Sequence, residues 1–124
     1  MSDMNYYYLD HSHVFSSLQD TYMADPIPRK LPKQYRENII GIEGALWTEY
    51  VRTSKKAEFQ LFPRLIAIAE RSWSAESAKN WNSFLQRIES ILKTLREREI
   101  NYANLKEANP PFWKKIYKYI ALLY

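Results

Sequence analysis

The stretch that decides the fold lies in the first half of the chain and reads Asn38-Ile39-Ile40-Gly41-Ile42-Glu43-Gly44-Ala45-Leu46-Trp47. Its aliphatic residues predict a β-strand that is buried at its start. The stretch holds both glycines of the chain, and a glycine within a strand marks a bulge or a close approach of another backbone. An earlier stretch, from Asn5 to Asp10, contains three consecutive tyrosines and predicts a short strand that precedes it.

Helical patterns follow the second predicted strand. A polar loop is expected from Arg52 to Glu58, and then a helix from about Gln60 to Trp73, with Pro63 tolerated in its first turn. The strongest pattern lies between Ala78 and Arg98, where the apolar residues recur every three or four positions and form one face for nearly five turns. These residues are Trp81, Phe84, Leu85, Ile88, Ile91, Leu92 and Leu95.

The remaining segments are less regular. Residues 11–37 contain three prolines and many polar side chains, so we expect a long connection, with room for a short helix from Phe15 to Met23. The tail that starts at Pro110 fits a short amphipathic helix. The order of strand, long loop, strand, loop and two helices predicts an α/β architecture. Two strands alone are marginally stable and cannot cover the apolar faces of the helices, so we expect that part of the sheet lies outside this chain.

Composition excludes several classes of function. The chain of 124 residues has no cysteine, which excludes disulfide scaffolds, thiolate zinc sites and cysteine nucleophiles. The net charge of +4 is mild, and the basic residues are interleaved with acidic ones, so no nucleic-acid partner is expected. No segment is apolar enough to span a membrane, and the first residues do not form a secretory signal. The aromatic content of 15% suits a core or a platform for sugar rings.

Two long motifs carry a family resemblance. The first is Gly41-Ile42-Glu43-Gly44-Ala45-Leu46-Trp47-Thr48-Glu49, and the second is Leu61-Phe62-Pro63-Arg64-Leu65-Ile66-Ala67-Ile68-Ala69-Glu70-Arg71-Ser72-Trp73-Ser74. Together they resemble the end of the catalytic domain of the β-N-acetylhexosaminidases, glycoside hydrolase family 20. Tyr8-Leu9-Asp10, the segment from Tyr22 to Pro28, and Trp81-x-x-Phe84-x-x-Arg87 resemble further family motifs in the same order.

The resemblance implies a fold and a set of site residues. Residues 1–103 would form the C-terminal portion of a (β/α)₈ TIM barrel, with its last two strands and their flanking helices, and residues 104–124 remain an unassigned tail. Side chains at the C-terminal ends of barrel strands point into the ligand crevice. By resemblance, Trp47 forms a wall behind the N-acetylglucosamine ring, Glu49 and Asp10 bind its hydroxyls, and Tyr8 donates to the acetamido oxygen. A spacing of two residues puts Tyr8 with Asp10, and Trp47 with Glu49, on one side of a strand.

The resemblance also implies a mechanism that this chain cannot complete. In the family, the acetamido group of the substrate attacks the anomeric carbon while a glutamic acid protonates the leaving oxygen and an adjacent aspartate stabilises the acetamido nitrogen. The sequence has no Asp-Glu pair and no His-x-Gly-Gly-Asp-Glu motif. We therefore expect a fragment with substrate-binding groups, no catalytic residue and no cofactor. The alternative is a non-catalytic remnant, or a carbohydrate-binding or interaction chain.

Other residues have structural interpretations. We expect Trp73 to pack in the core, and Arg64 and Glu70 to form a buried ion pair. His11 and His13 have no evident third ligand, so no metal site is expected. Exposed apolar surface would favour self-association. The preference for gluco- or galacto-configured sugars, the linkage and the compartment stay open, although family members are often exported, periplasmic or lysosomal.

Overall fold

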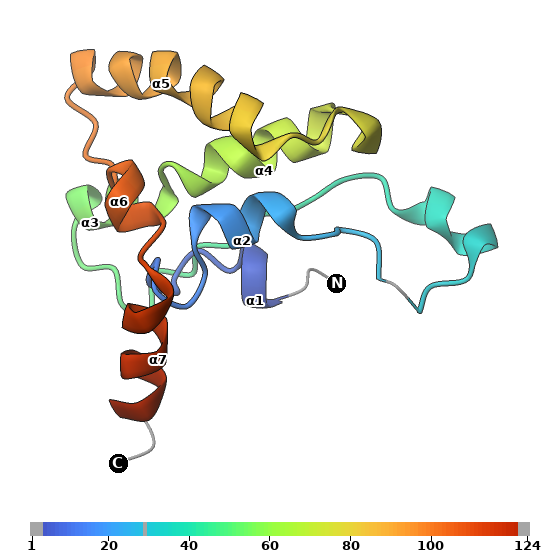
Figure 1. Ribbon diagram of the computed structural model, residues 1–124, viewed down its shortest axis with the longest axis horizontal. Helices are drawn as coiled ribbons and strands as arrows, with labels where there is room; N and C mark the ends of the chain where they lie inside the picture. The colour runs from blue at the N-terminus through green and yellow to red at the C-terminus, as the bar shows by residue number, and fades with distance from the viewer. Residues whose placement is uncertain (1–3, 29, 122–124) are drawn as a thin grey trace.

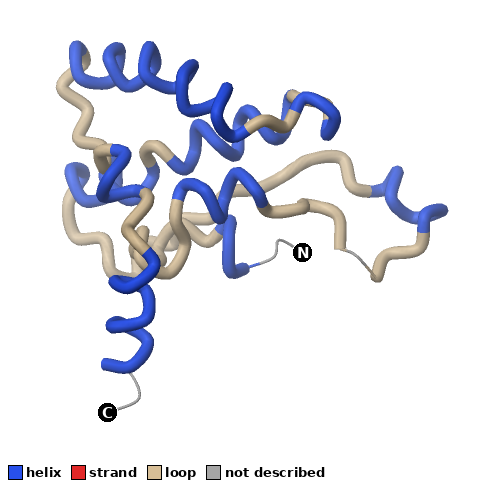
Figure 2. The backbone as a smooth tube through the Cα atoms, in the orientation of Figure 1, coloured by secondary structure: helices blue, strands red, loops and turns tan. Residues whose placement is uncertain are grey.

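The computed structural model describes residues 4–28 and 30–121, and this part of the chain is mostly helical (Figures 1 and 2). Figure 2 shows helices and loops, and no strand is drawn in the described residues. The elements are α1 (Met4–Tyr7), α2 (Leu18–Met23), η1 (Lys33–Asn38), α3 (Ser54–Leu61), α4 (Arg64–Trp73), η2 (Glu76–Ala78), α5 (Trp81–Glu97), α6 (Leu105–Ala108) and α7 (Phe112–Ala121).

The two predicted strands are reduced to a single parallel bridge between Tyr8 and Ala45. Leu9 N donates to Ala45 O at 2.7 Å, and Ala45 N donates to Tyr7 O at 3.0 Å. The strand prediction is wrong for the residues of α1 and for most of 38–47. Two lone strands are marginal in water, and the carbonyl of Tyr6 is instead bonded by the hydroxyl of Thr21 at 3.1 Å. Only the point at which the two segments meet has the predicted pairing.

The helix boundaries around Pro63 also differ from the prediction. The expected loop at 52–58 is wrong, because Thr53 caps α3 by accepting a hydrogen bond from Lys56 N at 3.1 Å. The single helix predicted for 60–73 is divided at Phe62 and Pro63, since a proline has no N–H to continue the ladder of α3. The short helix expected near residues 15–23 is confirmed as α2, which begins at a capping box formed by Ser17 and Asp20.

The larger core forms where α2, α4 and α5 pack together, and it confirms the helix predicted between Ala78 and Arg98. Tyr22 of α2 stacks on Phe84 of α5 with a centroid distance of 4.4 Å. Of the predicted apolar face, four residues are buried, whereas Ile91 is exposed. The buried members of this core are Leu18, Tyr22, Ala67, Phe84, Ile88, Leu92, Leu95, Ala103 and Ala108.

A smaller core lies beneath the β-bridge and is built from Tyr7, Leu9 and Ile68. Gly44 faces it, and a Cβ atom at this position would lie 2.9 Å from Ile68 Cδ1 and 3.4 Å from Leu9 Cδ1. Gly44 is therefore closely approached by side chains, and not by another backbone as expected from the sequence. Gly41 has nothing within 4 Å of such an atom.

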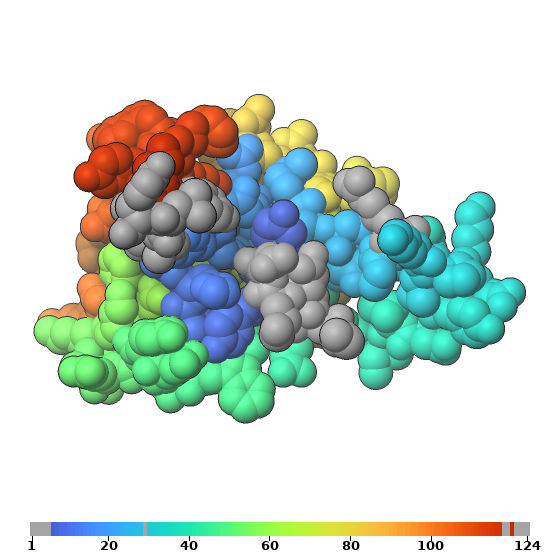
Figure 3. Space-filling model, turned by 90° about the horizontal axis from the view of Figure 1, so that it is seen from below, coloured from blue at the N-terminus to red at the C-terminus, as the bar shows by residue number. Residues whose placement is uncertain are grey.

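Several large apolar side chains lie on the surface. Trp73 is 92% exposed, so its predicted place in the core is wrong. The reason is the helical period, because α4 buries Arg64, Ala67, Ile68 and Arg71 on one face and residue 73 falls outside that face. The part of the chain that contains η1 projects away from the other helices (Figures 1 and 3). Ile40, which follows η1 in the sequence, is 98% exposed.

The tail folds back onto the start of the chain. Lys115 of α7 donates to Asp20 of α2 with an Nζ to Oδ2 distance of 2.6 Å, while the rest of α7 extends away from the other helices (Figure 1). Phe112, Trp113 and Tyr117 are exposed. Among the described residues, no helix is both long and apolar enough to cross a membrane.

Candidate sugar-binding site

The β-bridge brings together the two sequence segments that carry the predicted site residues. Asp10 lies two residues beyond Tyr8 and is 5% exposed. Its Oδ2 atom accepts a hydrogen bond from the backbone N of Trp47 at 2.5 Å. Its Oδ1 atom is buried and has no hydrogen-bond partner among the described residues. Asp10 therefore fixes the backbone at Trp47 and keeps one carboxylate oxygen as an unused acceptor.

The backbone between Trp47 and Glu49 is a turn. Thr48 has a φ of 61°, in the left-handed region that a β-branched residue rarely adopts. Val51 N donates to Thr48 O at 3.1 Å and closes the turn. The strand spacing that predicted a shared side for Trp47 and Glu49 does not apply to this backbone. Both side chains are nevertheless exposed, and the indole of Trp47 is 74% accessible to solvent.

The electrostatics of Tyr8 link three of the four predicted residues. Partial desolvation, followed by the negative charges of Asp10 and Glu49 and the phenol of Tyr50, raises the pKa of Tyr8 above its ordinary value of 10.0. Charges affect a pKa over short distances only, so these groups share one neighbourhood. The phenol stays protonated at neutral pH and can act as a hydrogen-bond donor. Its ring meets the edge of His11 at a centroid distance of 5.0 Å.

Arg64 donates a hydrogen bond to the backbone next to Asp10. The predicted ion pair between Arg64 and Glu70 is wrong. The guanidinium is fully buried and donates to three carbonyls, those of Leu9 (2.8 Å), Gln60 (2.8 Å) and Ser16 (3.1 Å). Burial lowers the pKa of Arg64 to about 10, against the opposing attraction of Asp10. Arg64 is therefore still charged at neutral pH.

Glu70 has other partners on the opposite side of the larger core. It accepts a hydrogen bond from the hydroxyl of Tyr22 at 3.1 Å and pairs with Arg87 at 2.5 Å. The family motif thus supplies two separate anchors, Arg64 beneath the candidate site and Glu70 between α2, α4 and α5.

His13 has a structural role. His13 is buried, and its Nε2 lies 2.9 Å from the carbonyl of Phe59. Burial is the largest cause that lowers the pKa of His13 to about 4, and the positive charge of Arg64 adds to it. The ring is therefore neutral at pH 7, with Nε2–H donating to the carbonyl. In the part of the chain that the structure describes, no group of three acidic, histidine or cysteine side chains is placed to hold a metal ion.

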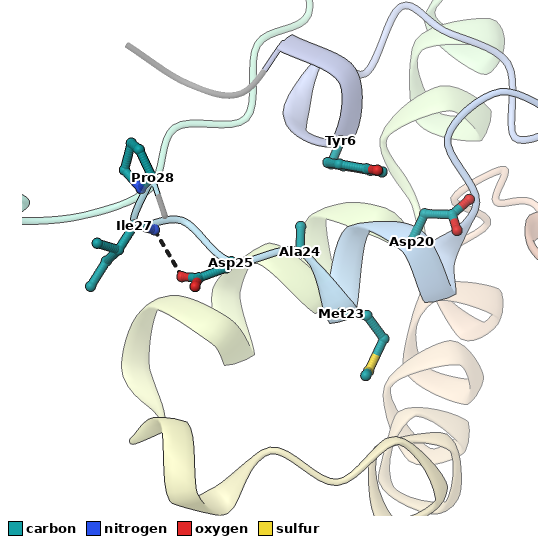
Figure 4. Close-up of a pocket in the computed structure, with 7 residues that line it drawn as sticks. All are labelled: Tyr6, Asp20, Met23, Ala24, Asp25, Ile27 and Pro28. Atoms are coloured by element: carbon teal, nitrogen blue, oxygen red, sulfur yellow. Dashed lines mark hydrogen bonds between the residues drawn. The ribbon is translucent and has the colours of Figure 1, made fainter. Parts of the chain in front are cut away.

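A surface hollow of about 430 Å³ lies apart from these residues (Figure 4). It is lined by Tyr6, Met23, Ala24, Pro28 and their neighbours, and Ile27 N donates to Asp25 Oδ1 at 2.9 Å within it. None of the four predicted site residues lines this hollow. The predicted site is a surface patch around Asp10.

Two functional features were not predicted from the sequence. Gln60 is buried and donates from Nε2 to the carbonyl of Asp10 at 2.8 Å, but nothing in its position along the chain indicates that partner. The left-handed turn at Thr48 was also missed, because threonine is not a residue type that signals such a turn.

Comparisons with known proteins point to one enzyme family. The model of glycosyl hydrolase family 20, catalytic domain, matches residues 1–76. A β-hexosaminidase from Porphyromonas gingivalis is 32% identical over 88 residues, which cover 71% of this chain and 11% of that protein. A chitooligosaccharidolytic β-N-acetylglucosaminidase from Ostrinia furnacalis is 35% identical over 89 residues, which cover 72% of this chain and 14% of that protein.

A solved structure is similar as well. The family 20 exo-β-N-acetylglucosaminidase from Vibrio harveyi, crystallised in complex with N-acetylglucosamine, aligns with a TM-score of 0.70 at 27% sequence identity. The alignment covers 82% of this chain and 18% of that one. The enzymes of this family have a TIM-barrel domain, and this chain spans less than a fifth of the length of each relative named here. The chain belongs to glycosyl hydrolase family 20.

Proposed function

We propose that this chain is the C-terminal portion of a β-N-acetylhexosaminidase barrel and that it supplies groups that bind the terminal N-acetylhexosamine of a glycan. The bridge at Tyr8 and Ala45 would correspond to the contact between the last two barrel strands, which is parallel here as in a barrel. The missing strands would cover the exposed aliphatic residues near Ile40.

One observation carries the proposal: the carboxylate of Asp10 accepts from the backbone N of Trp47. This contact joins residues that are 37 positions apart and ties the Asp10 carboxylate, whose buried Oδ1 atom has no partner among the described residues, to the backbone of the exposed Trp47. A pyranose ring needs an apolar plane for its C–H face and acceptors for its hydroxyls. Trp47 provides the plane, and Asp10 and Glu49 provide the acceptors.

Tyr8 has a separate role in the proposed site. Desolvation and then the neighbouring negative charges raise the pKa of its phenol above the ordinary value of 10.0, so the protonated hydroxyl can donate to the acetamido oxygen of the sugar. In a substrate-assisted retaining reaction, that oxygen forms a bond to the anomeric carbon as the bond to the leaving oxygen breaks. A hydrogen bond from Tyr8 would orient the acetamido group for this attack.

The proton for the leaving oxygen must come from elsewhere in the parent enzyme. The chain has no adjacent Asp-Glu pair. We therefore expect the purified chain to bind N-acetylglucosamine without hydrolysing a chromogenic N-acetyl-β-glucosaminide. Turnover by the wild-type chain that is lost in Trp47→Ala would mean that a general acid is present, and would contradict this part of the proposal.

Binding itself is tested by calorimetric titration of the chain with N-acetylglucosamine, a readout that does not depend on the tryptophans. We expect Trp47→Ala to weaken binding by about two- to tenfold, because aromatic stacking contributes about 0.5–1.5 kcal/mol. Trp73→Ala is the matched control, since Trp73 is also exposed but lies at the end of α4. Equal affinities for the two variants would contradict the site.

The second candidate is an interaction chain that associates through exposed apolar side chains. The observation in its favour is the exposure of Ile40, Trp73 and Phe112, since large exposed apolar surfaces mark interfaces. Sedimentation of the chain distinguishes the two candidates. Concentration-dependent oligomers that fail to bind N-acetylglucosamine would favour this alternative, whereas a monomer that binds the sugar would exclude it.

A further inference from the structure

We infer that Gln60 is a positioning residue of the sugar-binding patch, which acts through the backbone of Asp10. The inference rests on the proposed function for its consequence on sugar binding. Its structural part, the control of the Asp10 and Trp47 contact by Gln60, stands on the geometry of the chain alone.

The side chain of Gln60 is almost fully buried at the end of α3. Its Nε2 atom donates to the carbonyl of Asp10 at 2.8 Å and approaches the carbonyl of His11 at 3.4 Å. Both partners are acceptors, so the amide must present its nitrogen to them. A long buried side chain that ends between two successive carbonyls fixes the direction in which that backbone leaves the bridge.

Arg64 donates a hydrogen bond to a further carbonyl of the same turn. It donates to the carbonyl of Leu9 at 2.8 Å and to that of Gln60 at 2.8 Å. The carbonyls of three successive residues, 9 to 11, are thus bonded by two side chains that flank Pro63. Arg64 also bonds Ser16, so its loss would disturb the fold widely. Among the described residues, the side-chain amide of Gln60 donates hydrogen bonds to carbonyls of this turn, and it is the better probe.

One more hydrogen bond connects the turn at residues 9 to 11 to Trp47. With its backbone fixed, Asp10 directs Oδ2 to the Trp47 N–H at 2.5 Å. Trp47 is followed by the left-handed turn at Thr48, a conformation that persists only where its surroundings enforce it. The path runs from the Gln60 amide to the Asp10 backbone, then to the Asp10 carboxylate and the backbone of Trp47.

The test is hydrogen exchange of the Trp47 amide in the full chain, compared between wild type and Gln60→Met. Methionine has a similar length but no N–H donor, so the carbonyls of Asp10 and His11 lose their partner. We expect the Trp47 amide to exchange at least about tenfold faster, as for the loss of one buried hydrogen bond. Amides in α5, such as those of Ile88 and Leu92, report global opening and should change less.

Gln86→Met is the matched control, because it makes the same substitution at an exposed position of α5. Gln60→Asn is the second variant; it keeps the amide but is one methylene too short, and it should give the same local effect with less risk to folding. An unchanged Trp47 amide in both Gln60 variants, or equal acceleration of the Trp47 and α5 amides, would overturn the inference.

A parallel titration with N-acetylglucosamine separates this inference from the proposed function. Faster Trp47 exchange together with weaker sugar binding supports both. Faster Trp47 exchange in a chain whose wild type binds no sugar supports the positioning role and contradicts the proposed function. Sugar binding that is unaffected although Trp47 exchange is faster would overturn the link between Gln60 and recognition.

Discussion

The layer formed by α2, α4 and α5 (the helical layer) and the segment from residue 39 to residue 53 differ in the interactions that hold them in place. In the helical layer, Phe84 and Tyr22 stack face to face and are almost completely buried. In the segment, Ile40 is almost fully exposed and Trp47 is three-quarters exposed. The β-bridge, the Asp10 hydrogen bond and the packing of the partly buried Ile42 and Leu46 on the smaller core attach the segment to the rest of the chain.

The difference shows that the helices bury a large apolar face within the chain, whereas the segment combines a small apolar contact at Ile42 and Leu46 with a few hydrogen bonds. Apolar burial is strong and does not depend on direction, so it fixes a core without fixing the orientation of one backbone. Hydrogen bonds depend on angle and distance, and they fix the orientation of the backbone at Asp10 and Trp47. The stability of the fold and the geometry of the candidate site therefore depend on different residues.

The largest expected effect is on the helical layer. We expect Phe84→Ala to lower the free energy of unfolding by about 3–5 kcal/mol, because it removes a buried aromatic ring and leaves a cavity. Trp73→Ala removes a larger but exposed side chain and should change it by less than about 0.5 kcal/mol. Denaturant unfolding of both variants checks this, and similar losses for the two would contradict the division between buried and exposed aromatics.

The next effect is a dependence on pH through His13, which lies beneath the junction of the two regions. Its pKa is lowered from 6.5 to about 4 in the folded chain, so the unfolded chain binds the extra proton first as the pH falls. The neutral ring contributes its full stabilisation above pH 6.5. As the pH falls toward 4, the free energy of unfolding decreases by about 3 kcal/mol in total. Unfolding free energies measured between these pH values check the prediction.

The pH range over which His13 titrates is set by its burial and by the groups that face it. They are the cations of Arg64 and Lys56 and the carbonyl of Phe59. Asp20 and Glu76 have pKa values lowered below their ordinary values of 3.8 and 4.5 and so titrate at lower pH. His13→Gln, which keeps a donor for the carbonyl, should flatten the dependence between pH 6.5 and 4.5. An equally steep dependence in this variant would assign the effect to another group.

The smallest effect concerns the turn at Thr48. Its φ of 61° is costly for a β-branched residue and free of strain for glycine. We expect Thr48→Gly to raise the free energy of unfolding by up to about 1 kcal/mol, while Thr48→Ala, which keeps a Cβ atom, should gain less. A loss of stability in Thr48→Gly, measured by denaturant unfolding, would show that the left-handed backbone is not strained.

The sequence predicted the helical layer better than the segment, for a physical reason. The apolar period of α5 depends only on local spacing, and Phe84, Ile88, Leu92 and Leu95 of the predicted face are buried as expected. The predicted strands depended on neighbouring strands, and with one bridge between them most of their length is not paired. Trp73 was misplaced because its apolar character was given more weight than its position relative to the buried face of α4.

For the candidate site, the sequence proposed a set of residues but not their arrangement. The family motifs indicated Tyr8, Asp10, Trp47 and Glu49, and whether they bind a sugar remains a prediction. The supporting bonds of Gln60 and Arg64 end on backbone carbonyls. Every residue carries a carbonyl, so no sequence pattern identifies which one a buried donor will reach.

The most direct test of the account is one pair of spectra that resolve the four tryptophan indole N–H groups, recorded with and without N-acetylglucosamine. The account predicts that the resonance of Trp47 moves with sugar concentration, while those of Trp73, Trp81 and Trp113 stay in place. A shift at Trp73 or Trp113 instead, or no shift at Trp47 at saturating sugar, would contradict the claim that this chain carries the sugar platform of its family at Trp47.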